Sequence, residues 1–126
     1  MSDNLFSIRI SKSDNPVANS DLQLLVAPYI FNKRFIIKKI VINNTINQRG
    51  TLKIWDKDLS GTTSLGSGSN SSPIFAFGIE PNPTSGVGTV TTTYTEDEIP
   101  NIIFNAGIAY RVDIASTNIA IEVEQF

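Results

Sequence analysis

Hydrophobic and polar positions alternate along much of this chain, most strictly in its last quarter. Isoleucine, tyrosine and valine occupy every second position of 108–114, and after a short Ser-Thr-Asn turn the alternation resumes from Ile119 to Val123. Successive side chains of a β-strand point to opposite faces of the sheet, so a period of two predicts half-buried strands. The short turn between the two segments predicts that Ile108–Phe126 forms an antiparallel hairpin that closes the fold.

Six earlier segments also have the composition of strands. They are 5–10, 22–26, 35–43, 51–57, 74–79 and 89–95. The third of these is apolar on both faces, which predicts a central strand, or a bulge near Lys38 and Lys39 that switches the face. Polar stretches at 11–16 and 43–50 are predicted turns, the second because Asn and Gly tolerate left-handed backbone conformations.

The remaining patterns agree with an all-β fold. In 51–57 the alternation directs Leu52 and Ile54 inward and Trp55 outward, where it is an exposed aromatic or packs on a neighbouring subunit. No window of ten residues or more has the 3.6-residue period of a helix, apart from one candidate helical turn at 96–101. About eight strands separated by turn signals predict an antiparallel β-sandwich, with a jelly roll among the connections that this number allows.

The length of 126 residues corresponds to one domain of ordinary size, able to bury a two-layer core. We expect residues 1–20 to form an extended N-terminal arm and residues 21–126 to form a single sandwich domain. The Gly- and Ser-rich stretch 58–73 is longer than an ordinary connection, and loops of this length are usually functional.

Two residue types are absent, and each absence limits the function. The chain has no cysteine, which argues against a secreted disulfide scaffold and fits synthesis in a reducing cytosol. It has no histidine, which removes the usual general base, the commonest zinc ligand and the partner of a nucleophilic serine. The N-terminus does not resemble a signal peptide, and no apolar stretch approaches the roughly 20 residues of a membrane helix. We therefore expect no enzymatic activity and no membrane partner.

Charge is distributed unevenly, although the net charge is only −2. Seven of the ten basic residues lie between positions 33 and 57, whereas acidic residues dominate from position 94 onward. If the two segments lie on different faces, the molecule has a basic side and an acidic side. The candidate partner-binding residues are Lys33, Arg34, Lys38, Lys39, Arg49, Lys53, Trp55 and Lys57. A nucleic-acid surface would use similar residues, but the acidic balance of the whole chain argues against it and favours a protein partner.

Other groups of residues give weaker evidence of a metal, phosphate or catalytic site. Asp56 with Asp58, and Glu96 with Asp97 and Glu98, are the carboxylate clusters, and they are interpreted as solvated charges at strand ends, with a weak calcium site or a glycosidase pair as alternatives. Neither Gly-x-Gly segment follows the strand-to-helix pattern of a phosphate loop, so both are interpreted as flexible loops. We therefore expect no catalytic residues, no metal, no cofactor and no small-molecule substrate.

Two segments together resemble a known family. The first runs from Val41-Ile42-Asn43-Asn44-Thr45 through a Gly turn into Thr51-Leu52-Lys53-Ile54-Trp55-Asp56, and the second is Phe104-Asn105-Ala106-Gly107-Ile108. They resemble small β-sandwich virion proteins of tailed bacteriophages, including head decoration or cement proteins. The resemblance covers about half of the chain and consists of turn and strand elements, so it transfers no catalytic or ligand residue.

The resemblance implies a non-enzymatic structural protein that is made in the host cytoplasm and decorates or cements a capsid. Its partner would be the major capsid protein, it would lie on the capsid surface of the virion, and it would be a homo-oligomer, a trimer in the typical case. The N-terminal arm, the basic face and the 58–73 loop are the candidate clamping surfaces. The alternative is a carbohydrate- or receptor-binding module, free-standing or in a tail fibre, with Trp55, Tyr29 and Tyr94 as a sugar platform.

Overall fold

The computed structural model describes residues 8–14, 16, 18, 22–26, 34–57, 73–84 and 86–125. Eight strands and no helix lie in this described part of the chain. The strands are β1 (Ile8–Asp14), β2 (Leu22–Val26), β3 (Phe35–Asn44), β4 (Gly50–Trp55), β5 (Phe75–Ile79), β6 (Val90–Tyr94), β7 (Gly107–Val112) and β8 (Thr117–Gln125).

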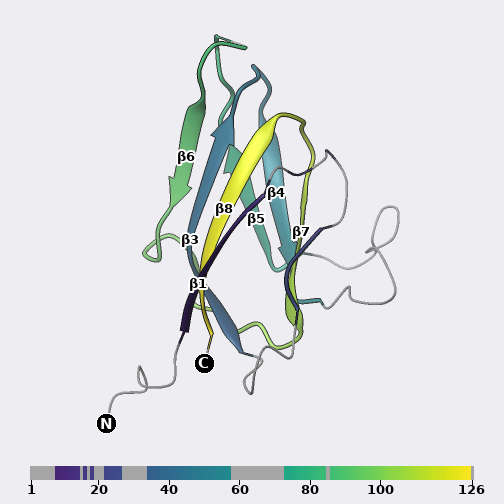
Figure 1. Cartoon of the computed structure of the whole chain (residues 1–126), viewed down its shortest axis with the longest axis vertical. Coiled ribbons are helices and arrows are strands. Elements are labelled where there is room, and N and C mark those ends of the chain that lie inside the picture. The colour runs from purple at the N-terminus through teal and green to yellow at the C-terminus, as the bar shows by residue number, and fades with distance from the viewer. Residues whose placement is uncertain are drawn as a thin grey trace.

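The strands form two four-stranded antiparallel sheets that face each other (Figure 1). Sheet A has the order β1-β8-β3-β6 and sheet B the order β2-β7-β4-β5. The pairings are nested, because the first strand pairs with the eighth, the second with the seventh, the third with the sixth and the fourth with the fifth. This connectivity is that of an eight-stranded jelly roll, so the predicted antiparallel sandwich is confirmed.

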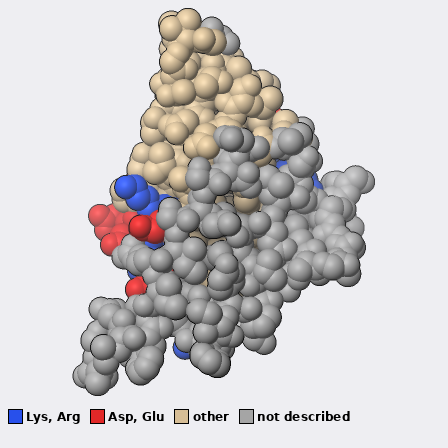
Figure 2. Space-filling model, viewed as in Figure 1, with Lys and Arg blue, Asp and Glu red and all other residues tan. Residues whose placement is uncertain are grey.

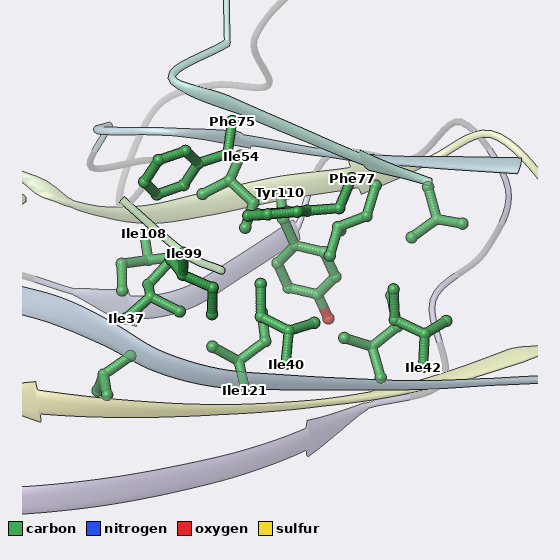
Figure 3. Close-up of a cluster of buried hydrophobic side chains, with 14 of the residues drawn as sticks. Ile37, Ile40, Ile42, Ile54, Phe75, Phe77, Ile99, Ile108, Tyr110 and Ile121 are labelled. Carbon is green, nitrogen blue, oxygen red and sulfur yellow. The ribbon is translucent and has the colours of Figure 1, made fainter. Parts of the chain in front are cut away.

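The core lies between the two sheets and consists of alternate residues of their strands. In Figure 3, Ile40, Ile42 and Ile121 of sheet A lie below Ile54 of sheet B, and the ring of Tyr110 points toward them. These side chains are almost completely buried, and each large one contributes about 1.5–3 kcal/mol of hydrophobic free energy. The inward directions predicted for Leu52 and Ile54 are confirmed, and Phe75, Phe77 and Ile79 of β5 are buried alternately in the same way.

β3 combines both predicted reasons for its two-sided apolarity. It lies between β8 and β6, so it is an interior strand of sheet A. Its register against β8 also shifts between Ile37 and Lys39, at the predicted bulge. The bulge lets Ile37 and Ile40, three positions apart, both enter the core.

The predicted closing hairpin is wrong. β7 pairs with β2 and β4 in sheet B, whereas β8 pairs with β1 and β3 in sheet A. The connection at 113–116 therefore crosses from one sheet to the other. A period of two identifies a strand and its buried face, but it does not identify the neighbour with which that strand pairs.

Two predictions near the N-terminal half also change. Residues 11–14, predicted as part of a turn, continue β1, which pairs with β8 from Ile8 to Asp14. The sandwich thus includes part of the segment 1–20 that was expected to be an arm.

Lys33 and most of the 58–73 loop lie outside the described residues. Within the described ranges, no helix is long and apolar enough to cross a membrane.

Gly50 has a different role from the one predicted. It does not lie in a left-handed turn, since it begins β4 and pairs with Ile79. A Cβ atom at this position would lie 2.7 Å from the side chain of buried Ile114. Glycine is therefore favoured here by a close approach between β4 and the side chain of Ile114 in the β7–β8 connection.

Candidate functional site

Three described connections meet at the end of the sandwich opposite the start of β1 and the end of β8, at the top of Figure 1. They are the β3–β4 loop (45–49), the β5–β6 loop (80–89) and the β7–β8 connection (113–116). We call them together the loop end. Thr45 joins two of them, because its backbone N–H and its hydroxyl both donate to Ser116 O, at 3.3 and 3.1 Å. Loops at the ends of a sandwich are common positions for binding residues.

Buried Asn44 fixes the first loop to the second. Its side-chain amide donates to Gln48 O at 2.9 Å and to Glu80 O at 3.0 Å, and its Oδ1 accepts from Ile46 N at 3.1 Å. The residue is completely buried. One neutral side chain thus satisfies three backbone groups that the turn would otherwise leave unpaired.

Asn82 does the same inside the second loop. Its amide nitrogen lies 3.1 Å from Gly88 O and 3.2 Å from Val87 O, and its Oδ1 accepts from the backbone N–H and the hydroxyl of Thr84, both at 3.0 Å. Its backbone N–H donates to Ile46 O at 2.9 Å. With only 2% of its surface exposed, Asn82 supplies the irregular loop with hydrogen bonds from inside.

The second loop presents an apolar side chain to solvent. Val87 is 71% exposed and stands between Gly86 and Gly88, whose φ angles of 82° and 68° lie in the left-handed region. Its backbone N–H donates to Thr84 O at 2.9 Å. The interpretation of this Gly-x-Gly segment as a flexible loop therefore gives way to a hydrogen-bonded turn that holds Val87 outward.

The outer part of the loop end carries no charge. Arg49, Glu80 and Asp113 lie next to strand ends, and the described residues beyond them in the three connections are all uncharged. Arg49 and Glu80 also pair with each other at 3.3 Å. In Figure 2 the upper part of the visible face has no charged atoms, and the charged side chains gather lower on the molecule.

An open pocket of about 410 Å³ lies beside the loop end. The described residues that line it have neutral side chains that can form hydrogen bonds: Asn43, Thr45, Thr89, Ser116, Thr117 and Asn118. Ser116 has a φ of 62°, an uncommon value for a residue with a side chain. The buried hydroxyl of Thr117 makes no hydrogen bond within the described part of the chain.

The predicted basic residues do not gather on one face. Lys38 and Lys39 belong to β3 of sheet A, whereas Lys53 belongs to β4 of sheet B, with Lys57 just beyond its end. Arg49 lies at the loop end, and exposed Arg34 precedes β3 at the other end. The outward faces of two packed sheets point in opposite directions, so these residues cannot form a single flat surface. Their role in binding stays a prediction.

The basic and acidic segments also meet rather than separate. Lys38 Nζ lies 3.5 Å from Glu96 and 3.7 Å from Glu124. Glu124 belongs to β8 and Glu96 follows β6, so both acidic residues come from the segment predicted to form the acidic side. On sheet A the two charge types therefore neutralise each other locally.

Trp55 is not an exposed aromatic. It is only 3% exposed, and the guanidinium of Arg111 lies 5.5 Å from the centre of its ring, within the range of a cation–π interaction. The proposed sugar platform of Trp55 with Tyr94 thus lacks its main member. The third member, Tyr29, lies outside the described residues.

Asp56 joins the two segments that carry the family resemblance. Its carboxylate accepts from three consecutive backbone N–H groups, those of Asn105 (3.1 Å to Oδ2), Ala106 (2.7 Å) and Gly107 (3.3 Å to Oδ1). A run of N–H groups of this kind forms an anion-binding concavity. The conspicuous Asp and Asn-x-Gly elements therefore form one structural clamp at the end opposite the loop end.

The other carboxylate cluster also has a structural contact. Glu98 accepts from the backbone N–H and the hydroxyl of Thr95, at 3.0 and 3.2 Å, and stabilises the turn after β6. Within the described residues, acidic side chains do not form a group of three that could hold a metal ion. Asp58 lies outside them.

Sequence reasoning missed the residues that organise the loop end. Asn44 was predicted only as part of a turn. The signal that could have found Asn82 is its position between two prolines, in a loop where Asn side chains often bond nearby backbone groups. The pocket could not be predicted at all, because it is formed by the ends of β3 and β8 and by loop residues that are distant in the sequence.

No protein-family model matches this chain, and no curated protein matches it significantly in sequence.

Proposed function

We propose that the protein is a non-enzymatic structural protein of a virion, which decorates or cements a capsid by docking its loop end on neighbouring capsid subunits. The observation that supports this most is the combination of rigid loops and an uncharged, partly apolar tip. The resemblance of the segments joined by Asp56 to phage decoration proteins points in the same direction.

Rigidity favours docking because a preorganised surface loses little conformational entropy on binding. The described loops are fixed by the side chains of Asn44 and Asn82, each with at least three hydrogen bonds to backbone or hydroxyl groups. Val87 is consequently held in one position before any partner arrives.

The lack of charge favours a protein surface as the partner. The buried centres of protein interfaces are depleted of charged residues, because charges are costly to desolvate. Val87 would supply a small apolar contact, and the Thr and Asn side chains around it would supply hydrogen bonds at the rim. Many symmetry-related copies would make such modest contacts sufficient for stable attachment.

The partner and location follow from the same proposal. The major capsid protein is the expected partner, and the capsid surface is the expected location. The basic residues lie on both sheets, so they would make secondary contacts with acidic capsid regions rather than form the main interface.

The test is cosedimentation of the purified protein with capsids assembled from the major capsid protein of the same virus. The variant Val87→Asp should weaken binding by about tenfold or more, since it places an unpaired charge in the interface. The matched control is Ile103→Asp, because Ile103 is an exposed apolar residue at the opposite end. Failure of the wild type to cosediment, or equal loss of binding in the two variants, contradicts the proposal.

The pocket beside the loop end supports a second candidate, a carbohydrate-binding module. Saccharides are neutral and rich in hydroxyl groups, and Ser, Thr and Asn side chains line this pocket, which is open to solvent and exposes mainly apolar atoms. The strained φ of Ser116 is typical of functional positions. None of the described residues that line the pocket is aromatic, so the observations favour protein docking.

A glycan array separates the two candidates. If the pocket binds sugar, Thr89→Arg should abolish the signal, whereas Asn101→Arg, at an exposed position of the opposite end, should leave it unchanged. Trp55→Ala does not serve this purpose, because Trp55 is buried and its loss would act on stability. Absence of glycan binding by the wild type contradicts the carbohydrate candidate.

A further inference from the structure

Four of the described strands lie at sheet edges, β1 and β6 in sheet A and β2 and β5 in sheet B. The outer edge of such a strand presents backbone N–H and C=O groups that can pair with a strand of another molecule. Monomeric proteins usually protect these edges by charges, bulges or covering side chains. The four edges of this protein differ in that protection.

Three edges are protected. The sequence of β1 includes Arg9, Lys12 and Asp14, and β2 has a bulge between Gln23 and Leu25. The β5 edge is covered by side chains that come from β6. Tyr94 donates its hydroxyl to Gly78 O at 2.7 Å, and Glu80 N donates to the hydroxyl of Thr92 at 3.2 Å.

The β6 edge lacks each of these devices. The strand Val90–Tyr94 contains no charged residue and no proline, and its pairing with β3 is regular along its described length. β3 is its only partner among the described strands, and it lies at the left margin of the sandwich in Figure 1. Thr91 and Thr93 are exposed. β-branched and aromatic residues of this kind also have high strand propensity.

We propose that β6 pairs with β6 of a second copy of this chain, antiparallel and around a two-fold axis at Thr92. In this register Thr91 lies opposite Thr93 of the partner subunit, and Val90 lies opposite Tyr94 of the partner subunit. No pair in this register brings two like charges together, and Thr–Thr pairs across strands are favourable. A symmetric interface of one surface with itself is the commonest basis of protein dimers.

The charges that flank β6 favour this direction of pairing. Glu96, Asp97 and Glu98 follow the strand, whereas the residues before it, from Gly86 to Thr89, are uncharged. In the antiparallel register the acidic run of one copy lies beside the uncharged run of the other. A parallel register would place the two acidic runs side by side, and their repulsion would oppose it.

The product is a dimer with one continuous sheet made from both copies of sheet A. This inference does not depend on the proposed function, because a dimer of this kind serves a capsid protein or a sugar-binding module equally. It differs from the trimer that the family resemblance implies.

The test is the mass in solution, by sedimentation equilibrium over a concentration series, of the wild type and two double variants. The substitutions Thr91→Lys with Thr93→Lys, and Thr91→Glu with Thr93→Glu, place like charges opposite each other in the proposed register. We expect the wild type to be a dimer and each double variant to be a monomer. An equimolar mixture of the two variants should form a heterodimer, because opposite charges then meet.

The heterodimer separates a pairing effect from a folding defect, since unfolded variants would not restore each other. Ala76→Lys is the matched control, because residue 76 is an exposed position on the covered β5 edge, and this variant should remain a dimer. A wild type that is monomeric or trimeric throughout the series, or a mixture that stays monomeric, overturns the proposal.

Discussion

The two ends of the sandwich fix their connections with different chemistry. At the loop end, the amides of buried Asn44 and Asn82 bind backbone groups of the β3–β4 and β5–β6 loops. At the other end, the charged carboxylate of Asp56 binds three N–H groups before β7. One end is held by neutral groups that both donate and accept, and the other by an anion that only accepts.

This difference explains where charge is found on the surface. An amide satisfies donors and acceptors without carrying a charge into the protein, so the loops that it holds can end in an uncharged tip. A carboxylate gives stronger hydrogen bonds to N–H groups, but it must remain partly accessible to water, as half-buried Asp56 does. The neutral end is thus suited to docking, and the charged end to holding the chain just before β7.

The largest effect on stability is expected when the side chain of Asn44, which holds the loop end with neutral groups, is removed. Asn44→Ala leaves the carbonyls of Gln48 and Glu80 and the N–H of Ile46 without their partner in a buried site. We expect the free energy of unfolding to fall by about 3 kcal/mol, because buried polar groups are then unsatisfied. Urea denaturation measures the loss. Asn47→Ala, at an exposed position of the same loop, is the control and should change stability little.

The carboxylate of Asp56 should contribute less to the free energy of unfolding, because it is closer to solvent. Asp56→Ala removes all three accepted hydrogen bonds, and we expect a loss of about 2 kcal/mol. Asp56→Asn keeps one oxygen acceptor and should lose about half as much. The same denaturation experiment on Asp97→Ala, which removes an exposed carboxylate, provides the reference. If Asp56→Ala proves more damaging than Asn44→Ala, the ranking of the two ends is reversed.

A third prediction concerns the close approach at the base of the loop end. Gly50→Ala would place its Cβ 2.7 Å from the side chain of Ile114, which must then shift within a packed region. We expect a loss of about 1.5 kcal/mol from this overpacking. Gly78→Ala is the control, because its Cβ would meet the Tyr94 hydroxyl only at an ordinary 3.7 Å. Equal thermal stability of the two variants would show that Ile114 has room to move.

Local features of this fold could be predicted from the sequence, because they depend on local alternation. The bounds of β2, the bulge beside Lys38 and the inward direction of Tyr110 all follow from the period of two and its interruptions. The partner of each strand could not be predicted in this way. β7 and β8 are separated by only four residues and still enter different sheets.

The candidate site was less predictable than the fold, for a physical reason. Charged residues attract attention in a sequence, but Lys38 and Arg49 are engaged in ion pairs, and the uncharged loop end depends on contacts such as that of Asn44 with Glu80, 36 positions away. Glycine in the Asn-Gly-rich segment suggested a turn, whereas Gly50 is favoured because Ile114 packs against it. Such requirements arise from tertiary neighbours, which alternation does not specify.

The smallest expected effect concerns the strip between the two ends, where Tyr94 joins β6 to the edge of β5. Burial, together with the nearby carboxylates of Glu80 and Glu98, raises the pKa of the Tyr94 hydroxyl above its ordinary value of 10.0. The unfolded chain therefore releases this proton at lower pH than the folded chain does. Stability should be retained below pH 10 and should decline as the pH rises above it, since ionisation then favours unfolding. Tyr94→Phe should decline less steeply in urea denaturation across this alkaline range. Parallel declines in the two proteins would mean that the Tyr94 proton does not contribute to holding the two sheet edges together.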